Sequence, residues 1–200
     1  MATLVKIVYN LVMVFEDFKQ KDSVTVVYTG AGKGKTTAGV GLMARALGTG
    51  WKVAFVQFIK LWDSGEHTFI NAIKPVYGDK ITFYKGGAGF YNAGELSSNL
   101  PPEQHIAEAR KTYDLAYRAA TSGEYQLVIC DEINNAVHEG LISVDDVKKL
   151  MTDKNNMTNL CLTGRDFPME LIDLVDIATD MTQLKHHFDD KILANRGIDY

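Results

Sequence analysis

A glycine-rich stretch near the N-terminus carries the residue types best suited to chemistry. Glycines at this spacing let backbone N–H groups turn inward around an anion, and a following helix adds the partial positive charge of its N-terminus. Lys35 would bring a point charge to a phosphate, and the Thr36 hydroxyl could bind Mg²⁺. The stretch therefore predicts a phosphate loop that binds MgATP. The predicted contacts are Gly30, Ala31, Gly32, Lys33, Gly34, Lys35, Thr36 and Thr37.

Two other places could complete a nucleotide site. Asp131 and Glu132 end an apolar run, and acids at the carboxyl end of a strand next to the phosphate-loop strand can hold Mg²⁺ directly or through water. Arg165 follows another apolar run and could clamp a phosphate bidentately. The simpler explanations are two acids that cap a strand in solvent and a lone surface arginine. Thr29 departs from the usual loop pattern, which has glycine there, so we expect an effectively shorter loop.

The elements that must position these residues alternate in type from residue 24 onward. Short β-branched runs are separated by segments of helical period, which is typical of βαβ units around a parallel sheet with helices on both faces. We expect helices that begin at Lys35, at Pro101-Pro102, after Ser143 and at Pro168. The expected strands are residues 24–28, 53–58, 81–84, 127–130, 160–163 and 177–181.

Residues 1–22 stand outside this alternation. Their apolar residues, from Leu4 to Phe18, are spaced as on one face of an amphipathic helix. Such a helix packs on its own domain or on a second subunit, and a lid over a ligand is the alternative. We therefore expect an N-terminal amphipathic segment at residues 1–22 and one domain at residues 23–200.

Bulk properties narrow the class of protein. The 200 residues are 46 % apolar, which is enough for one buried core. A net charge of −4 gives no general attraction to nucleic acid. No apolar run approaches the roughly 20 residues of a membrane span, and the two cysteines, Cys130 and Cys161, lie in apolar runs, so we expect a cytoplasmic protein with reduced thiols.

Short motifs beyond the loop are more selective than the loop itself. Residues 24–200 resemble the ATP:corrinoid adenosyltransferases of the CobA/CobO/BtuR type, because they contain these motifs in the same order along the chain. The matching stretches are Gln57-Phe58-Ile59-Lys60, Gly65-Glu66, Asp131-Glu132-Ile133, Thr163-Gly164-Arg165, residues 171–176, Lys185-His186 and Gly197-Ile198-Asp199-Tyr200.

The resemblance implies a P-loop NTPase-like (RecA-like) fold and transfer of the 5′-deoxyadenosyl group of ATP to a cobalt(I) corrinoid, with triphosphate as the leaving group. Lys35, Glu132 and Arg165 would then be catalytic, and Thr36 and Glu132 would hold Mg²⁺ with Asp131 in support. A homodimer and a reduced flavoprotein electron donor are also implied.

The sequence departs from the family pattern in the segment of the corrinoid pocket. A Gly-Phe-x-Trp segment contributes to that pocket in the family, and here Phe90 matches while Asn92 stands in place of the tryptophan. Tyr91 could substitute for the missing aromatic ring. None of the histidines is assigned as a cobalt ligand, and we expect His67 and His105 on helix surfaces.

Two other functions fit parts of the sequence. A P-loop phosphotransferase or NTPase would share Lys35 and Mg²⁺ but release ADP, with Glu66 or Asp131 as the base. A non-catalytic corrinoid or nucleotide carrier would be compatible with Asn92 and with Ala31, where many relatives have asparagine.

Overall fold

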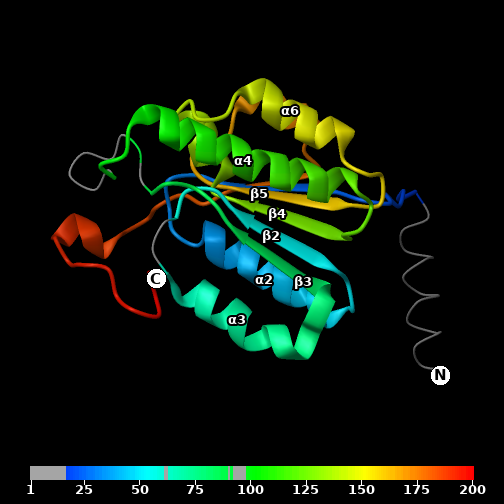
Figure 1. Ribbon diagram of the computed structural model, residues 1–200, viewed down its shortest axis with the longest axis horizontal. Helices are drawn as coiled ribbons and strands as arrows, with labels where there is room; N and C mark the ends of the chain where they lie inside the picture. The colour runs from blue at the N-terminus through cyan, green and yellow to red at the C-terminus, as the bar shows by residue number, and fades with distance from the viewer. Residues whose placement is uncertain (1–16, 61–62, 90, 92–97) are drawn as a thin grey trace.

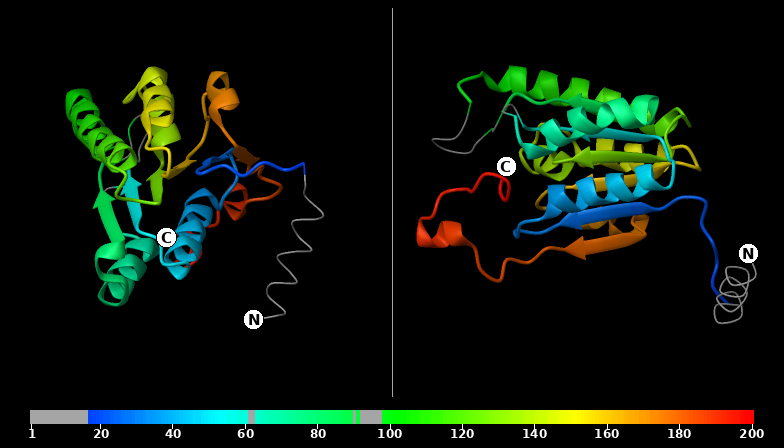
Figure 2. Two further views of the ribbon diagram at one scale, coloured as in Figure 1. Left: turned by 90° about the vertical axis from the view of Figure 1, so that its right-hand side faces the viewer. Right: turned by 90° about the horizontal axis from the view of Figure 1, so that it is seen from below.

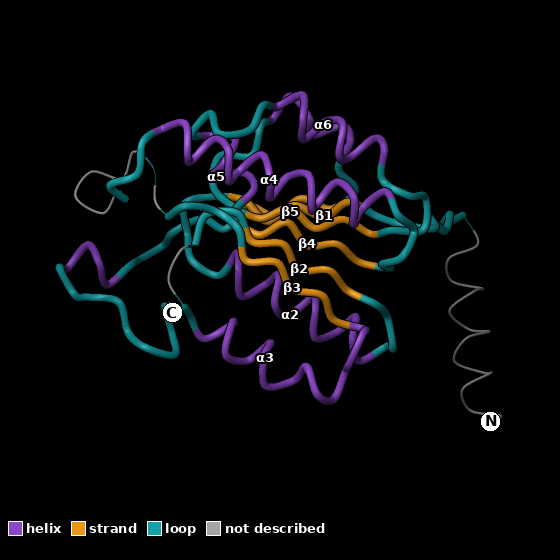
Figure 3. The backbone as a smooth tube through the Cα atoms, viewed as in Figure 1, coloured by secondary structure: helices purple, strands orange, loops and turns teal. Residues whose placement is uncertain are grey.

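A six-stranded parallel sheet forms the centre of the molecule, with the strand order β3-β2-β4-β5-β1-β6. The computed structural model describes residues 17–60, 63–89, 91 and 98–200. Figure 3 shows the strands as one layer between helices, which confirms the expected α/β class. The strands are β1 (Thr25–Thr29), β2 (Val53–Gln57), β3 (Ile81–Lys85), β4 (Leu127–Asp131), β5 (Asn159–Thr163) and β6 (Ile177–Asp180).

Helices cover the two faces of the sheet in pairs. Helices α4 (Pro102–Thr121) and α6 (Val144–Asp153) lie on one face, and α2 (Lys35–Gly48) and α3 (Gly65–Tyr77) lie on the other (Figures 1 and 2). The remaining helical elements are short: α5 (Ile133–His138) and the 3-10 helices η1 (Gly78–Lys80), η3 (Met169–Leu174) and η4 (His187–Asp190).

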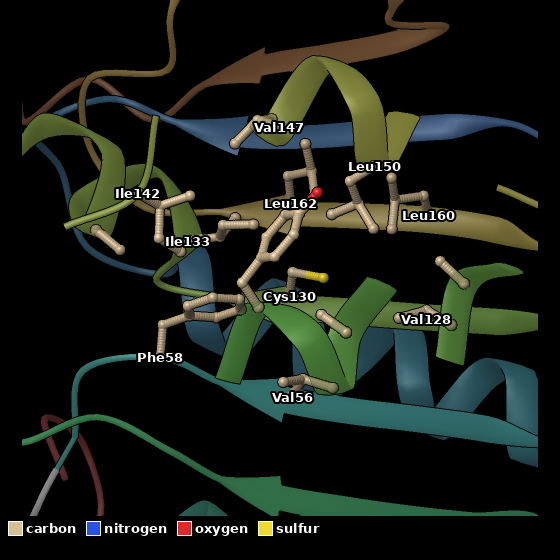
Figure 4. Close-up of a cluster of buried hydrophobic side chains, with 14 of the residues drawn as sticks. Val56, Phe58, Val128, Cys130, Ile133, Ile142, Val147, Leu150, Leu160 and Leu162 are labelled. Carbon is tan, nitrogen blue, oxygen red and sulfur yellow. The ribbon is translucent and has the colours of Figure 1, made fainter. Parts of the chain in front are cut away.

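The alternation of side chains along the strands separates the core into two clusters. Val56, Val128 and Leu162 point toward α4 and α6, where Figure 4 shows them packed together. Phe55 and Ile129, which occupy the opposite parity, pack against α2 and α3. The last residues of β2, β4 and β5 are polar: Gln57, Asp131 and Thr163. Because side chains alternate along a strand, these three lie on the same face as Phe55 and Ile129, the face covered by α2 and α3.

Most predicted helix starts are confirmed. Helix α2 begins at Lys35 and α4 at Pro102, while Ser143 caps α6 by accepting a hydrogen bond from the backbone N–H of Asp146. The helix expected after Pro168 is instead the 3-10 helix η3. No start was predicted for α3, which contains a proline, or for α5, which has only 6 residues.

Three side chains differ from their predicted surroundings. Ile106 was expected on the buried face of α4 but is 47 % exposed, whereas Ala109 and Tyr113 on that helix are buried. His67 and His105 were expected on helix surfaces and are both buried. Periodicity alone could not identify them, because each histidine has a specific hydrogen-bond partner from outside its helix: Gln57 for His67 and Ser98 for His105.

The strand order corrects one further expectation. The strand that ends in Asp131 is not next to the phosphate-loop strand, because β5 pairs with both β4 and β1 and lies between them. All strands run parallel, so their carboxyl ends still meet at one edge of the sheet. That edge is where the predicted site residues gather.

The C-terminal segment extends beyond this edge and returns to it. After β6 the chain passes through η4, and the C-terminus lies beside the start of α3 (Figures 1 and 2). A Cβ built on Gly65 would lie 3.7 Å from the Tyr200 carbonyl oxygen. The amphipathic helix expected at residues 1–22 falls mainly outside the described residues. Within the described part of the chain, no helix is sufficiently long and apolar to cross a bilayer.

Candidate nucleotide site

The loop between β1 and α2 is shaped by its glycines. Gly30 has φ 98° and Gly34 has φ 107°, values that residues with a side chain rarely adopt. A Cβ on Gly30 would also lie 2.0 Å from Asp180 Oδ1. Gly34 directly precedes α2, so the backbone N–H groups of the loop lie next to those of the helix N-terminus. An anion site of this kind requires that arrangement.

Lys35 lies inside the curve of this loop. Its Nζ donates to the carbonyl oxygens of Gly30 at 2.7 Å and Gly32 at 2.6 Å. Burial lowers the pKa of Lys35, and the negative charge of Glu132 opposes that shift. The ammonium group is therefore held where it can face an anion bound by the loop.

Thr29 is accommodated because it belongs to the strand and not to the curve. It is the last residue of β1, and its hydroxyl accepts a hydrogen bond of 3.1 Å from the backbone N–H of Phe167. Glycine is therefore not needed at this position. On the other side of the loop, the Gly32 N–H donates to the carbonyl of Met181 at 2.6 Å, which ties the loop to the segment after β6.

Asp131 is a fully buried acid at the end of β4. Its Oδ1 accepts from the Thr163 hydroxyl at 2.7 Å, and its Oδ2 accepts from the Gln57 amide at 2.8 Å. Thr36 Oγ1 lies 3.4 Å from the same Oδ2. Burial raises the pKa of Asp131, while the hydrogen bonds from Thr163 and Gln57 oppose that shift.

Glu132 turns the chain from β4 into α5. It has φ 63°, a left-handed conformation that is uncommon for a residue with a side chain, and its backbone N–H donates to the Thr163 hydroxyl at 3.0 Å. This turn directs the side chain into the cavity that the loop borders. Burial, followed by the charge of Asp131, raises the pKa of Glu132 to about 7.

A cavity of about 810 Å³ brings most of the predicted residues together. Loop residues 31–37, Tyr91, Glu132 and Arg165 line it, whereas Gly30 and Asp131 do not. The Tyr91 ring lies 5.0 Å from the ring of His105, between their centroids. Phe90 and Asn92, the other two residues considered for a corrinoid pocket, lie outside the described residues.

Two cavity residues lie outside the predicted adenosyltransferase site, although Glu66 was considered as the base of a phosphotransferase. Lys60 and Glu66 form an ion pair at the cavity wall. Burial by itself raises the pKa of Glu66, but the hydrogen bond from Lys60 is among those that outweigh it and lower the pKa to about 2. Both residues lie within motifs that carry the family resemblance. Those motifs were the sequence feature that could have identified Lys60 and Glu66 as site residues.

The C-terminal residues also line the cavity. Asp199 forms an ion pair with Lys33 of the loop, and its Oδ2 accepts from the Asn195 backbone N–H at 2.6 Å. His186, Ile198 and Tyr200 border the same cavity. The Gly-Ile-Asp-Tyr ending, which was noted only as a family motif, is thus brought to the phosphate loop.

Comparisons with known proteins agree with this arrangement. Residues 21–200 match the family model of the ATP:corrinoid adenosyltransferases BtuR/CobO/CobP. A corrinoid adenosyltransferase from Sinorhizobium is 35 % identical over 177 residues, which cover 88 % of this chain and 79 % of the relative. One from Escherichia coli K12 is 31 % identical over 178 residues, with 88 % and 85 % covered.

Among solved structures, a KaiC-like protein from Pyrococcus horikoshii superimposes with a TM-score of 0.49 at 16 % identity, over 86 % of this chain and 77 % of that chain. The family match covers nearly the whole described chain and includes the phosphate loop, the end of β4 and the C-terminal motif. The chain belongs to the ATP:corrinoid adenosyltransferase family.

Proposed function

We propose that this protein transfers the 5′-deoxyadenosyl group of ATP to the cobalt(I) of a corrinoid and releases triphosphate. The observation that carries the proposal is the shared cavity: in a member of this family, one space of about 810 Å³ is bordered by the phosphate loop, Glu132, Arg165 and Tyr91. It offers cations and backbone N–H groups for a polyphosphate at one side and an aromatic ring at another.

The loop would hold the triphosphate of ATP. Residues 30–37 supply backbone N–H groups, and Lys35 would exchange its two loop carbonyls for phosphate oxygens. Arg165 is exposed and lines the cavity, so it is free to approach the same anion. These groups would stabilise the charge that collects on the leaving triphosphate.

The residues near Thr36 fit Mg²⁺. Magnesium prefers oxygen ligands, and this place offers the Thr36 hydroxyl, the Glu132 carboxylate and, behind them, Asp131. A separation of 3.4 Å between Thr36 Oγ1 and Asp131 Oδ2 suits two groups that act on one ion or its water. When bound, the ion would neutralise charge on the phosphates.

The transfer itself needs no proton from the protein. The cobalt(I) of the corrinoid substrate donates an electron pair to C5′ of the ribose, the C5′–O bond breaks, and its electron pair leaves with triphosphate. The protein's part is to place C5′ in line with the cobalt and to keep water out. Phe90 and Tyr91 are proposed to border the corrinoid.

A phosphotransferase is less compatible with the site. It would need a base near the acceptor hydroxyl. Glu66 is paired with Lys60 and has a pKa of about 2, which makes it a weak base. Asp131 is fully buried and accepts hydrogen bonds on both oxygens, so it cannot reach an acceptor in the cavity.

Other parts of the proposal rest on the family or on the sequence alone. A homodimer and a reduced flavoprotein as electron donor are proposed from the family, whereas a cytoplasmic location is proposed from the apolar runs and the two cysteines of the sequence. They do not alter the assignment of the nucleotide site.

An anaerobic assay tests the proposal directly. Purified protein, MgATP and chemically reduced cobalamin are mixed, and the cobalt(I) absorbance is followed. Loss of that absorbance with formation of a light-sensitive alkylcobalamin is the expected result. A protein that binds corrinoid and MgATP without alkylation would be a carrier, which would contradict the proposal.

A further inference from the structure

A chain of buried hydrogen bonds connects the start of α3 to Asp131. The Ser64 backbone N–H lies 3.1 Å from His67 Nδ1, and His67 Nε2 lies 2.6 Å from Gln57 Oε1. The Gln57 amide nitrogen lies 2.8 Å from Asp131 Oδ2. Gln57 and Asp131 are 0 % exposed and His67 is 4 % exposed, so water cannot replace these contacts.

The register of the sheet explains why these residues meet. Gln57 ends β2 and pairs with Asp131 at the end of β4, so the two side chains lie side by side on the α2 and α3 face. His67 lies in the first turn of α3, above Gln57, and its ring packs 5.3 Å from that of Phe83, between centroids.

Each donor and acceptor in the chain is determined by its neighbour. A backbone N–H can only donate, so His67 Nδ1 accepts and the ring proton must be on Nε2. Nε2 then donates to Gln57 Oε1, and this fixes which end of the Gln57 amide is its oxygen. The amide nitrogen is thereby directed at the carboxylate. Burial lowers the pKa of His67, which agrees with a neutral ring.

Without His67, Gln57 Oε1 would lose its described donor, and the amide would be oriented only through its nitrogen, by the carboxylates of Asp131 and Glu66. A flipped amide would direct its oxygen at the carboxylate of Asp131, and two acceptors would then face each other. The second oxygen of Asp131 is held by Thr163 at 2.7 Å, so both halves of the carboxylate have an assigned donor. Fixed donors of this kind orient the groups that hold an ion.

The charged groups around this series of hydrogen bonds do not supply an alternative donor for Asp131. Lys60 is paired with Glu66, and Glu66 Oε1 lies 3.5 Å from the Gln57 amide nitrogen. Asp63 lies 3.5 Å from His67 Nδ1 and is 86 % exposed, and it is also paired with Lys85. The Gln57 amide therefore remains the described donor to Asp131 Oδ2 at normal hydrogen-bond length.

We propose that His67 and Gln57 are positioning residues of the MgATP site, which fix the carboxylate of Asp131 relative to Thr36. The inference rests on the proposed function only in taking the site to bind MgATP. His67 does not line the cavity and would act on a bound ion only through Gln57 and Asp131.

Two substitutions of His67 separate positioning from helix capping. The oxygen of asparagine in His67→Asn replaces Nδ1 and keeps the bond from Ser64, but the side chain is too short to reach Gln57. The amide of glutamine in His67→Gln replaces Nε2 and keeps the bond to Gln57, but it leaves the Ser64 N–H without its partner. The two variants lose opposite ends of the same chain.

Calorimetric titration with ATP, with and without Mg²⁺ and in the absence of corrinoid, measures the effect without turnover. We expect His67→Asn to reduce the Mg²⁺-dependent gain in ATP affinity by about tenfold or more, as for outer partners of metal ligands, and His67→Gln to retain most of it. The loss in His67→Asn should disappear when it is combined with Asp131→Asn, because the two act on one group.

Each of the following results from the His67 variants would overturn the inference: His67→Asn with normal Mg²⁺-dependent binding, equal losses in both His67 variants, or additive losses with Asp131→Asn. If the His67 variants do not fold by circular dichroism, Gln57→Met provides the same test, and normal Mg²⁺-dependent binding there would also overturn it. Wild-type ATP affinity that is independent of Mg²⁺ would overturn it as well. Intact Mg²⁺-dependent binding without adenosyl transfer would instead contradict the proposed function alone.

Discussion

Replacing Lys35 by methionine should weaken ATP binding by about 10- to 100-fold. Lys35 Nζ lies within 2.7 Å of two loop carbonyls, inside the curve proposed for the triphosphate. A hydrogen bond from a charged donor contributes roughly 1.5–3 kcal/mol, and each ~1.4 kcal/mol corresponds to a tenfold change in affinity. Methionine preserves the apolar stem, so the substitution removes the charge and its donors with little loss of packing.

Calorimetric titration of MgATP without corrinoid measures this change. Lys149→Met is the matched control, because Lys149 pairs with Asp153 on α6 and does not line the cavity. It removes the same charge and should leave ATP affinity within about twofold of the wild-type value, since exposed charges far from a site are screened by salt. If Lys35→Met binds ATP as tightly as Lys149→Met, the placement of the triphosphate against Lys35 is refuted.

Four further substitutions test other parts of the structure. Glu132→Gln should raise the Mg²⁺ concentration needed for half-maximal adenosyl transfer by about tenfold or more, and an unchanged Mg²⁺ titration would contradict its role. Gly41→Ala in α2 meets open space and should stabilise the fold by about 0.5–1 kcal/mol in urea unfolding, whereas Gly30→Ala should destabilise it. The hydrogen-bonded Arg110 guanidinium lowers the pKa of Asp146 to about 2, below its ordinary value of 3.8. The stability this pair contributes is present above the higher value and is lost as pH falls toward the lower one, so the acid-induced loss of stability should be smaller in Asp146→Asn.

The phosphate loop could be predicted because its information is local. Glycine spacing, Lys35 and Thr36 lie within one short stretch, and the structure places that stretch between β1 and α2 as predicted. Most strands were also predictable, since β1, β2, β4 and β5 are runs of largely buried residues. Asp131 and Glu132 were identified for the same reason, as acids that directly follow such a run.

The arrangement between distant segments could not be predicted in this way. The neighbours of β1 depend on how the strands pair across the sheet. No local sequence pattern indicates that β5 lies between β1 and β4. His67 was expected on a helix surface, because its burial depends on Gln57 in another strand. The approach of Asp199 to Lys33 likewise depends on the path of the whole C-terminal segment.

The phosphate product of an anaerobic reaction with reduced cobalamin tests the central claim most directly. Phosphorus NMR of the products, with MgATP as the only nucleotide supplied, distinguishes cleavage at C5′ from cleavage at the γ-phosphate. Intact triphosphate formed in equal amount to the new alkylcobalamin is the result predicted here. ADP as the product, with the cobalt(I) absorbance unchanged, would contradict adenosyl transfer and indicate a phosphotransferase or NTPase.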